Sequence, residues 1–364
     1  MRNTGHTEQQ TAILVDQDLI HFIAEPSELN VPAEETVFDI AHAIAEHDCD
    51  AGTEVRKWAA SLDHSSINWF DAWGGSFMIS LFRLTAPERA LIFLHETGVL
   101  RHYFPELSEM AGVDEKSVEN GDQARSYQHK DVFYHTMQVL RNTCAVTENI
   151  WLRFAALLHD IAKPQTKRFD PETGWTFHGH AELGARMVKR IFRRLEYGKE
   201  PRVYAQKLVA LHLRPMALVD EGVTDSAVRR LLTDAGEEIE DLLTLCRCDI
   251  TSKNPKKVRR YLDNYERLVD KIHEVIYADR LRDWQPPIDG QDIMNELGIK
   301  EGIRVGIMKA RVEDAILEGT VANTREAALE YMRSIKQEVM EGEPVKRGTP
   351  MKQRLKKLPD HLAQ

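Results

Sequence analysis

The sequence lacks any long uncharged apolar stretch in its 364 residues. A helix that spans a bilayer needs about 18 or more consecutive apolar residues, so we expect no membrane span and no membrane partner. The first ten residues, MRNTGHTEQQ, are polar and do not show the basic-then-apolar start of a secretory signal. We therefore expect a cytoplasmic protein.

Cysteine is scarce, and its spacing excludes two common uses. The four cysteines are Cys49, Cys144, Cys246 and Cys248, and no two of them form a CxxC pair. This spacing supports neither a disulfide framework nor a zinc knuckle. A reducing compartment fits the cysteine content best.

The alternation of apolar and polar residues that marks a strand is nearly absent. Apolar residues instead recur every three or four positions, as in DVFYHTMQVLRNTCAV and AELGARMVKRIFRRL. The sequence therefore predicts a mainly α fold, a helical bundle with helical units on its N-terminal and C-terminal sides.

Five segments are predicted from composition and from helix breakers such as the prolines of WQPPIDG. In chain order they are a helical N-terminal region of unknown role, a helical lead-in with a polar linker, a central helical block, a small helical tail unit and a basic tail. Their boundaries are 1–83, 84–128, 129–284, 285–341 and 342–364.

The formal net charge of −10 opposes a surface that binds nucleic acid all over. Basic residues nevertheless cluster in RMVKRIFRRL (186–195), KNPKKVRR (253–260) and KRGTPMKQRLKKL (346–358). A locally positive face on an acidic protein can hold phosphates. Each cluster could equally be a solvated helix face.

Metal-binding side chains recur in the central block at helix ends and on apolar helical faces. His159 and Asp160 end the apolar stretch WLRFAALLHD, and the others are His135, His178, His180, His212 and Asp249. In a helical core such positions can converge between packed helices. A lone histidine is more often a hydrogen-bonded core residue, so the prediction depends on the set, whose burial without partners would be costly.

The chemistry of this set suits a transition metal. Imidazoles combined with carboxylates favour Fe, Mn, Co, Ni or Zn, with Mg a further candidate, and one or two ions could be held. Asp160 could bridge two ions, which could activate a water and clamp the oxygens of a phosphate ester. Lys163, one helical turn later, would add a positive charge for a phosphate oxygen. Alternatively, Lys163 is a helix C-terminal charge that meets the dipole.

The ordered pattern His135, His159-Asp160, His180, His212 and Asp249 resembles the HD-domain superfamily of metal-dependent phosphohydrolases in its six-ligand form. The resemblance implies that these six residues are the metal ligands. It also implies that Lys163 contacts phosphate, so Asp160 and Lys163 are the predicted catalytic residues. Of the two neighbouring histidines it selects His180, which leaves His178 facing the substrate or supporting a ligand. We expect Arg186 and Arg190 of the arginine-rich segment to help bind phosphate oxygens.

Longer stretches are similar to the C-terminal half of bacterial tRNA CCA-adding enzymes, over about residues 84–335. They include APERALIFLHETGVLRHYFPEL and PPIDGQDIMNELGIKEGIRVGIMKARVEDAILEG. In that family the HD part is associated with 2′,3′-cyclic phosphodiesterase, 2′-nucleotidase and phosphatase activities. The resemblance thus implies nucleotides or RNA ends as substrates and tRNA as a partner.

The nucleotidyltransferase palm of that family is not predicted here. Asp16 and Asp18 in DQD have the spacing of two metal-binding carboxylates, but no glycine-rich turn precedes them and WGGSF (73–77) comes later. We interpret them as surface charge and do not expect CCA addition. Trp58, Trp69 and Trp73 could form a stacking surface, although packing in a core or interface is favoured.

Three functions remain open at this point. The first is a metal-dependent phosphohydrolase or phosphodiesterase that acts on nucleotide or RNA-end phosphoesters. The second is a tRNA- or RNA-binding protein, derived from a CCA-adding nucleotidyltransferase or partnering one, with a vestigial HD site. The third is a regulatory helical protein with a structural metal, for which a site without an open coordination position would be expected.

Overall fold

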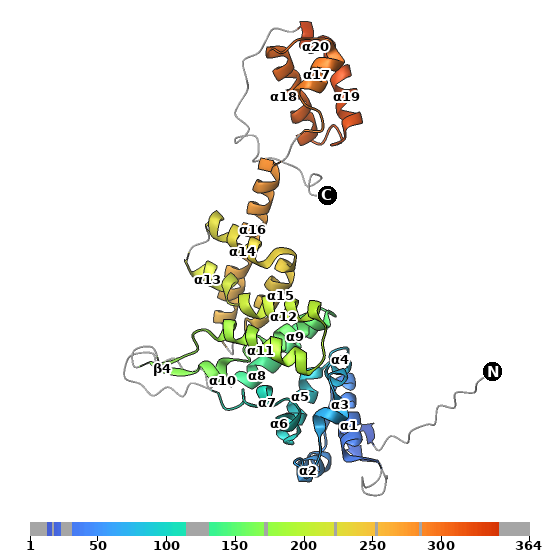
Figure 1. Ribbon diagram of the computed structural model, residues 1–364, viewed down its shortest axis with the longest axis vertical. Coiled ribbons are helices and arrows are strands. Elements are labelled where there is room, and N and C mark those ends of the chain that lie inside the picture. The colour runs from blue at the N-terminus through green and yellow to red at the C-terminus, as the bar shows by residue number, and fades with distance from the viewer. Residues whose placement is uncertain are drawn as a thin grey trace, which may run out of the picture. The chain divides into compact units, whose positions relative to one another are not determined.

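The computed structural model describes residues 13–16, 18–22, 31–113, 131–170, 174–221, 224–251, 254–283 and 286–341 (Figure 1). The predicted linker beyond residue 113 and the predicted basic tail lie outside these residues. The chain divides into two compact units, Met1–Val275 and Ile276–Gln364. Most described residues are helical, which confirms the predicted mainly α fold. No helix in the described part of the chain is long and apolar enough to span a membrane.

The first unit begins with a small sheet that the sequence analysis did not predict. Its strands are β1 (Ile13–Asp16), β2 (Leu19–Phe22) and β3 (Asp50–Ala51). β1 and β2 are antiparallel, and β3 joins β2 in parallel. Asp16 and Asp18 lie exposed where β1 turns into β2, an arrangement that fits their interpretation as surface charge.

Four helices complete the N-terminal region, α1 (Ala33–His47), α2 (Thr53–Ser61), α3 (Trp69–Trp73) and α4 (Ser76–Leu81). Trp69 and Trp73 are 1% and 5% exposed, and the indole N–H of Trp73 donates to the carbonyl of Glu34 at 3.1 Å. Trp58 packs edge-on against Phe22 with ring centroids 5.3 Å apart. These tryptophans therefore serve packing, as favoured from the sequence.

Three helices lead into the central block, α5 (Pro87–Glu96), α6 (Val99–Tyr103) and α7 (Pro105–Ser108). Pro87 occupies the first turn of α5, where a missing backbone N–H is harmless. Buried apolar residues of this segment belong to one continuous core that extends from Ile20 to Val209. The N-terminal region and the central block are thus parts of the same packed body.

The central block consists of helices and one hairpin. Its elements are α8 (Val132–Cys144), α9 (Ile150–Leu158), α10 (Lys163–Thr166), β4 (Arg168–Asp170), β5 (Gly174–Thr176), α11 (His180–Arg194), α12 (Lys199–Leu211), α13 (Arg214–Glu221), α14 (Asp225–Ala235), the 3₁₀ turn η2 (Gly236–Glu238), α15 (Ile239–Asp249) and α16 (Pro255–Asp283). α9 packs against both α8 and α12, and α15 packs against α8. The boundary between the two units falls within α16.

The second unit has its own small core. Its helices after α16 are α17 (Gly290–Leu297), α18 (Ile303–Leu317), α19 (Arg325–Ser334) and α20 (Lys336–Glu341). Ile293, Met308 and Met332 are completely buried in that core. Asp289 and Asp292 form a capping box at the start of α17, which satisfies backbone donors that the helix itself cannot use.

Candidate metal centre

The six predicted ligands lie near helix ends in the centre of the first unit. His159 and His212 directly follow α9 and α12, and Asp160 is the next residue after His159. His180 is the first residue of α11, and Asp249 is the last residue of α15. His135 lies one turn into α8. Each helix therefore contributes its ligand at a position that the backbone fixes.

The structure brings these six side chains together in two adjoining groups. Within each group the ligand atoms lie within 4.8 Å of one another. The groups are His135, His159 and Asp249, and Asp160, His180 and His212. Mixed imidazole and carboxylate groups of this kind suit divalent transition metals. The assignment of these residues as ligands remains a prediction.

Asp160 lies between the two groups. Its Oδ2 atom is 3.1 Å from Nε2 of His159 and 3.7 Å from Nε2 of His135. Its Oδ1 atom is 3.4 Å from Nε2 of His180 and 3.8 Å from Nε2 of His212. Each carboxylate oxygen thus faces a different pair of imidazoles, the geometry expected of a bridging ligand.

Hydrogen bonds at the outer ring nitrogens orient the imidazoles. Nδ1 of His159 is 2.8 Å from the carbonyl of Ala156, and Nδ1 of His212 is 2.7 Å from the carbonyl of Val209. His180 makes the same contact with the carbonyl of Phe177 at 2.7 Å. A carbonyl can only accept, so Nδ1 carries the proton and each Nε2 presents its lone pair to the centre when the ring is neutral. Histidines that bind metals are commonly held in this way.

The fourth imidazole, that of His135, is oriented by a side-chain hydroxyl and not by a backbone carbonyl. Nδ1 of His135 is 3.0 Å from the hydroxyl of Thr251, and its Nε2 is 2.9 Å from Oδ1 of Asp249. Thr251 was not singled out in the sequence analysis. Its position two residues after Asp249 was the only signal that could have identified it.

The burial of the centre is uneven. The side chains of His159 and Asp160 are 1% and 2% exposed, whereas that of Asp249 is 30% exposed. His159 Nε2 is buried and has no hydrogen-bond partner among the described residues, although it lies 3.1 Å from Oδ2 of Asp160 and 3.6 Å from Oδ1 of Asp249. An orphaned buried nitrogen that faces two carboxylates fits a cation-binding role. The exposure of Asp249 leaves one side of the centre accessible to water.

Burial and neighbouring charges shift the pKa values of His159 and His212 in opposite directions. Burial lowers the pKa of His212 to about 4, and the nearby His159 adds to this shift. Burial also opposes protonation of His159, but the carboxylates of Asp160 and Asp249 outweigh it and raise the pKa of His159 to about 10. Burial disfavours ionisation of both carboxyl groups, yet His159 and its neighbours hold the pKa of each well below its usual range. A proton on His159 thus supplies part of the positive charge that a bound cation would supply.

Lys163 lies beside the centre but is paired. Its Nζ atom is 2.8 Å from Oδ2 of Asp160, and its side chain is 13% exposed. The ammonium group also lies 5.5 Å from the centroid of the Phe177 ring. A phosphate contact by Lys163 therefore stays a prediction, in which the phosphate would share this ammonium with Asp160.

The other predicted phosphate-binding residues are exposed. His178 lies in the turn before α11, and Arg186 and Arg190 lie on the exposed side of α11. A rise of about 1.5 Å per residue puts Arg186 roughly 9 Å and Arg190 roughly 15 Å along the helix axis from His180. A substrate would need to extend along α11 to meet Arg190, so these contacts remain predictions.

Close packing between α11 and α12 sets the positions of His180 and His212. A Cβ atom at Gly184 would come 3.1 Å from Cγ1 of Val209, so a larger residue there would require Val209 to shift by a few tenths of an ångström. The thiol of Cys246 on α15 donates to the carbonyl of His212 at 2.9 Å. Backbone contacts of this kind hold the ends of helices that carry the candidate ligands.

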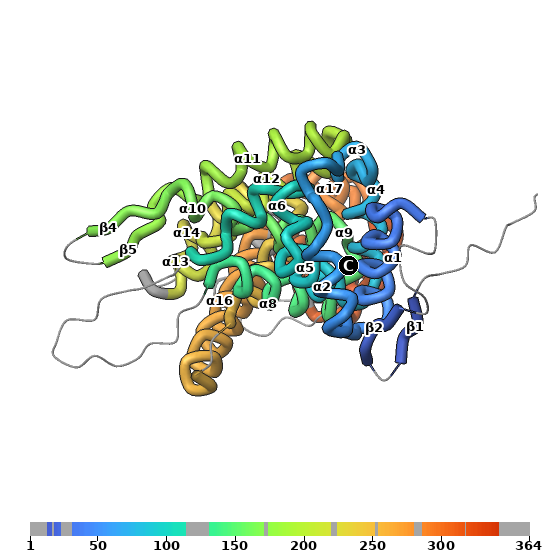
Figure 2. The backbone as a smooth tube through the Cα atoms, turned by 90° about the horizontal axis from the view of Figure 1, so that it is seen from below, coloured from blue at the N-terminus to red at the C-terminus, as the bar shows by residue number. Residues whose placement is uncertain are grey.

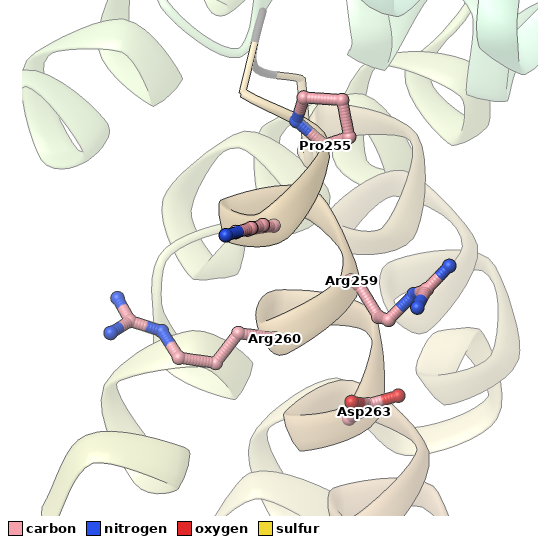
Figure 3. A pocket seen from close by; sticks show the side chains of 5 residues that line it. Pro255, Arg259, Arg260 and Asp263 are labelled. Atoms are coloured by element: carbon pink, nitrogen blue, oxygen red, sulfur yellow. The ribbon is translucent and has the colours of Figure 1, made fainter.

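A basic surface begins shortly after Asp249, at the start of α16. A surface pocket there is lined by Pro255, Lys256, Arg259, Arg260 and Asp263 (Figure 3). Lys256, Lys257, Arg259 and Arg260 are exposed, and none has a carboxylate partner among the described residues. This cluster, predicted as KNPKKVRR, includes none of the six candidate ligands.

The family model for the HD domain matches residues 132–275. The chain therefore contains an HD domain, a domain of metal-dependent phosphohydrolases. HD domains bind divalent metals, and the six grouped side chains are found within the matched residues. The predicted resemblance to this superfamily is confirmed.

Among curated proteins, the chain is similar to tRNA nucleotidyltransferases. It is 29% identical over 283 residues to the A-adding tRNA nucleotidyltransferase of Deinococcus radiodurans, which covers 75% of this chain and 61% of that protein. It is 30% identical over 281 residues to the CC-adding tRNA nucleotidyltransferase of Thermus thermophilus, with 72% and 58% covered. The chain thus spans about three fifths of the length of these two relatives. The match to the C-terminal half of CCA-adding enzymes is confirmed.

Among solved structures, the chain is similar to the crystal structure of the Bacillus stearothermophilus CCA-adding enzyme in complex with CTP. The alignment covers 89% of this chain and 67% of that chain at 14% sequence identity. Its TM-score of 0.34 is too low to establish a common arrangement.

Proposed function

We propose that this chain is a metal-dependent phosphohydrolase that acts on phosphoesters of nucleotides or RNA ends. The observation that carries the proposal is the convergence of four imidazoles and two carboxylates, three of the imidazoles anchored at Nδ1 by backbone carbonyls. Such anchoring directs each Nε2 lone pair toward the centre, where a shared cation would meet it.

The roles of the residues follow from their geometry. His135, His159 and Asp249 would hold one ion, His180 and His212 another, and Asp160 could serve both. A bound divalent ion would supply Lewis acidity and an activated water. Asp160 and Asp249 keep a depressed pKa, so both are ionised at neutral pH and ready to accept a cation. The ammonium of Lys163 would contribute positive charge to a non-bridging phosphate oxygen.

Hydrolysis of 2′,3′-cyclic AMP by the purified full chain tests the proposal. With Mn²⁺, Ni²⁺ or Co²⁺ we expect turnover that a chelator removes, because the protein groups alone cannot activate the water. His159→Gln should lose that turnover, since it removes an imidazole buried in the centre. His102→Gln, a change of an exposed histidine outside the centre, is the matched control. Turnover that survives both the chelator and His159→Gln would contradict the proposal.

A second candidate function is RNA binding without catalysis. The relatives act on tRNA by their names, and the basic cluster at the start of α16 has cations without carboxylate partners in the described part of the chain. Cations of this kind bind phosphates by displacing counterions. In this alternative the HD site would be vestigial, and tRNA would bind with strong salt dependence.

Replacing Lys256, Arg259 and Arg260 together with glutamine tests the basic cluster. If all three contact RNA phosphates, the slope of log affinity for tRNA against log salt should fall by about 2 to 3, since each contact contributes roughly 0.7–0.9. Lys57→Gln with Arg101→Gln removes exposed cations of α2 and α6, away from the basic cluster in the sequence, and should leave the slope unchanged. An unchanged slope in the triple variant would exclude this surface. Salt-dependent tRNA binding without phosphoester hydrolysis would favour the binding function over the enzyme.

A further inference from the structure

The β4–β5 hairpin carries exposed aromatic side chains that the catalytic proposal does not use. Phe169 on β4 and Trp175 on β5 are 56% and 38% exposed, although most large apolar side chains of the first unit are buried. In both views the hairpin projects beyond α10 and α11 (Figures 1 and 2). A contiguous exposed apolar patch is found more often at an interaction or ligand-binding site than elsewhere on a protein surface.

The two aromatic side chains share one face of the hairpin. Phe169 is the direct cross-strand partner of Trp175, and their ring centroids are 5.2 Å apart at an interplanar angle of 70°. The ammonium of Lys167 lies 4.6 Å from the centroid of the Trp175 ring. Lys167 directly precedes β4, and its contact with the Trp175 ring places it beside the aromatic pair. Lys167, Phe169 and Trp175 therefore form a surface with both cationic and aromatic character.

A short series of contacts connects this surface to the candidate metal centre. Two residues after Trp175, roughly 7 Å along an extended chain, comes Phe177. The carbonyl of Phe177 anchors His180, and its ring lies 5.5 Å from the ammonium of Lys163. Lys163 in turn is 2.8 Å from Asp160. The hairpin therefore connects the residues that flank the centre, α10 on one side and the start of α11 on the other.

The aromatic pair alone could be explained by hairpin stability, because cross-strand aromatic pairs stabilise sheets. That explanation does not account for the exposure of both rings or for the two lysines placed along the same route. Aromatic rings stack on nucleobases whatever the sequence, and neighbouring cations meet the phosphates. The positive charge and the aromatic rings thus both match a nucleotide whose phosphoester would lie at the centre.

We propose that the hairpin face of Lys167, Phe169 and Trp175 binds the nucleobase of the substrate by stacking on Trp175. The inference rests on the proposed phosphohydrolase function and narrows its substrates to phosphoesters that carry a nucleobase next to the scissile group. Free nucleotides and RNA ends both offer this chemistry.

Binding of AMP and of ribose 5-phosphate to the full chain, measured by calorimetry in chelator, tests the stacking separately from catalysis. Trp175→Leu should weaken AMP binding about 5- to 140-fold, the range found when a base loses its aromatic partner. Trp175→Phe keeps an aromatic face and should stay within about threefold of wild type. Ribose 5-phosphate has no base to stack, so the variants should bind it as wild type does. Equal AMP affinities in wild type and Trp175→Leu, or no AMP binding by wild type, would overturn the inference.

Two further experiments test nucleobase stacking independently of the proposed phosphohydrolase activity. They also determine whether the bound nucleobase belongs to a free nucleotide or to an RNA end. With metal present, Trp175→Leu should lower kcat/KM for 2′,3′-cyclic AMP but not for a base-free methyl phosphodiester. Equal losses on both substrates would contradict a base subsite while leaving the phosphohydrolase intact. Absence of any hydrolysis by wild type would instead refute the proposed function, and the calorimetry would still decide on stacking. Tighter binding of an oligoadenylate than of AMP, with the same loss in Trp175→Leu, would assign the base to an RNA end.

Discussion

Asp160→Asn should strongly weaken metal binding and abolish phosphoester hydrolysis while leaving the shape of the side chain unchanged. Asp160 is the one candidate ligand that faces the imidazoles of both groups, with its two oxygens 3.1–3.8 Å from four Nε2 atoms. The amide removes the negative charge and leaves Lys163 and His159 without their buried partner. Loss of one member of a buried charge pair costs about 3–5 kcal/mol. A contribution of that size from the carboxylate to a bound cation corresponds to a fall in metal affinity of roughly 10²- to 10⁴-fold, which is the loss we expect.

The measurement is metal content after dialysis, together with kcat/KM for 2′,3′-cyclic AMP. Asp270→Asn, on the exposed surface of α16, is the matched control and should keep both values. Circular dichroism of each variant checks that the helices are retained. A variant that binds metal and turns over substrate like wild type would remove Asp160 from the centre and with it the bridging arrangement.

Arg153→Leu should destabilise the first unit more than any surface change. Arg153 is only 6% exposed, and its guanidinium donates to four backbone carbonyls rather than to a carboxylate. Two of them, Phe82 at 2.6 Å and Leu84 at 3.2 Å, belong to the N-terminal side, while Cys144 ends α8 and Thr147 lies between α8 and α9. Leucine fills the space but leaves these acceptors unsatisfied, so we expect a loss of about 3–5 kcal/mol.

Thermal unfolding of the metal-free protein measures this effect as a decrease in Tm of roughly 6–20 °C. Arg101→Leu replaces an exposed arginine of α6 and should change stability by no more than about 0.5 kcal/mol. Arg153→Lys should fall in between, because an ammonium keeps the charge but not the planar set of donors. A Tm for Arg153→Leu equal to that of Arg101→Leu would show that the four carbonyls find other partners.

The candidate centre could be predicted from the sequence because its residues recur where helices end. Burying polar, metal-binding side chains at such places costs folding free energy unless they contact one another. The side chains of His159 and His180 both contact Asp160. The helices themselves followed from apolar spacing, since that spacing is what buries one face of each.

Other features depend on three-dimensional contacts that no local pattern encodes. Pairing of Lys163 with Asp160 competes with the predicted phosphate contact, and nothing in the spacing distinguishes the two. The anchoring of imidazoles by carbonyls involves backbone atoms, which every residue has. The N-terminal sheet escaped prediction because its strands have at most four residues, too few to show alternation.

The contact between α4 and the turn after α11 has a consequence for how the chain assembles during synthesis. A Cβ atom at Gly75 would overlap the carbonyl oxygen of Leu195, and the hydroxyl of Tyr197 donates to the carbonyl of Gly75 at 2.7 Å across 122 positions of sequence. At about 5–20 residues per second, a ribosome needs roughly 6–24 s to make the intervening chain. The packing at Gly75 can therefore be completed only that long after α4 has been synthesised.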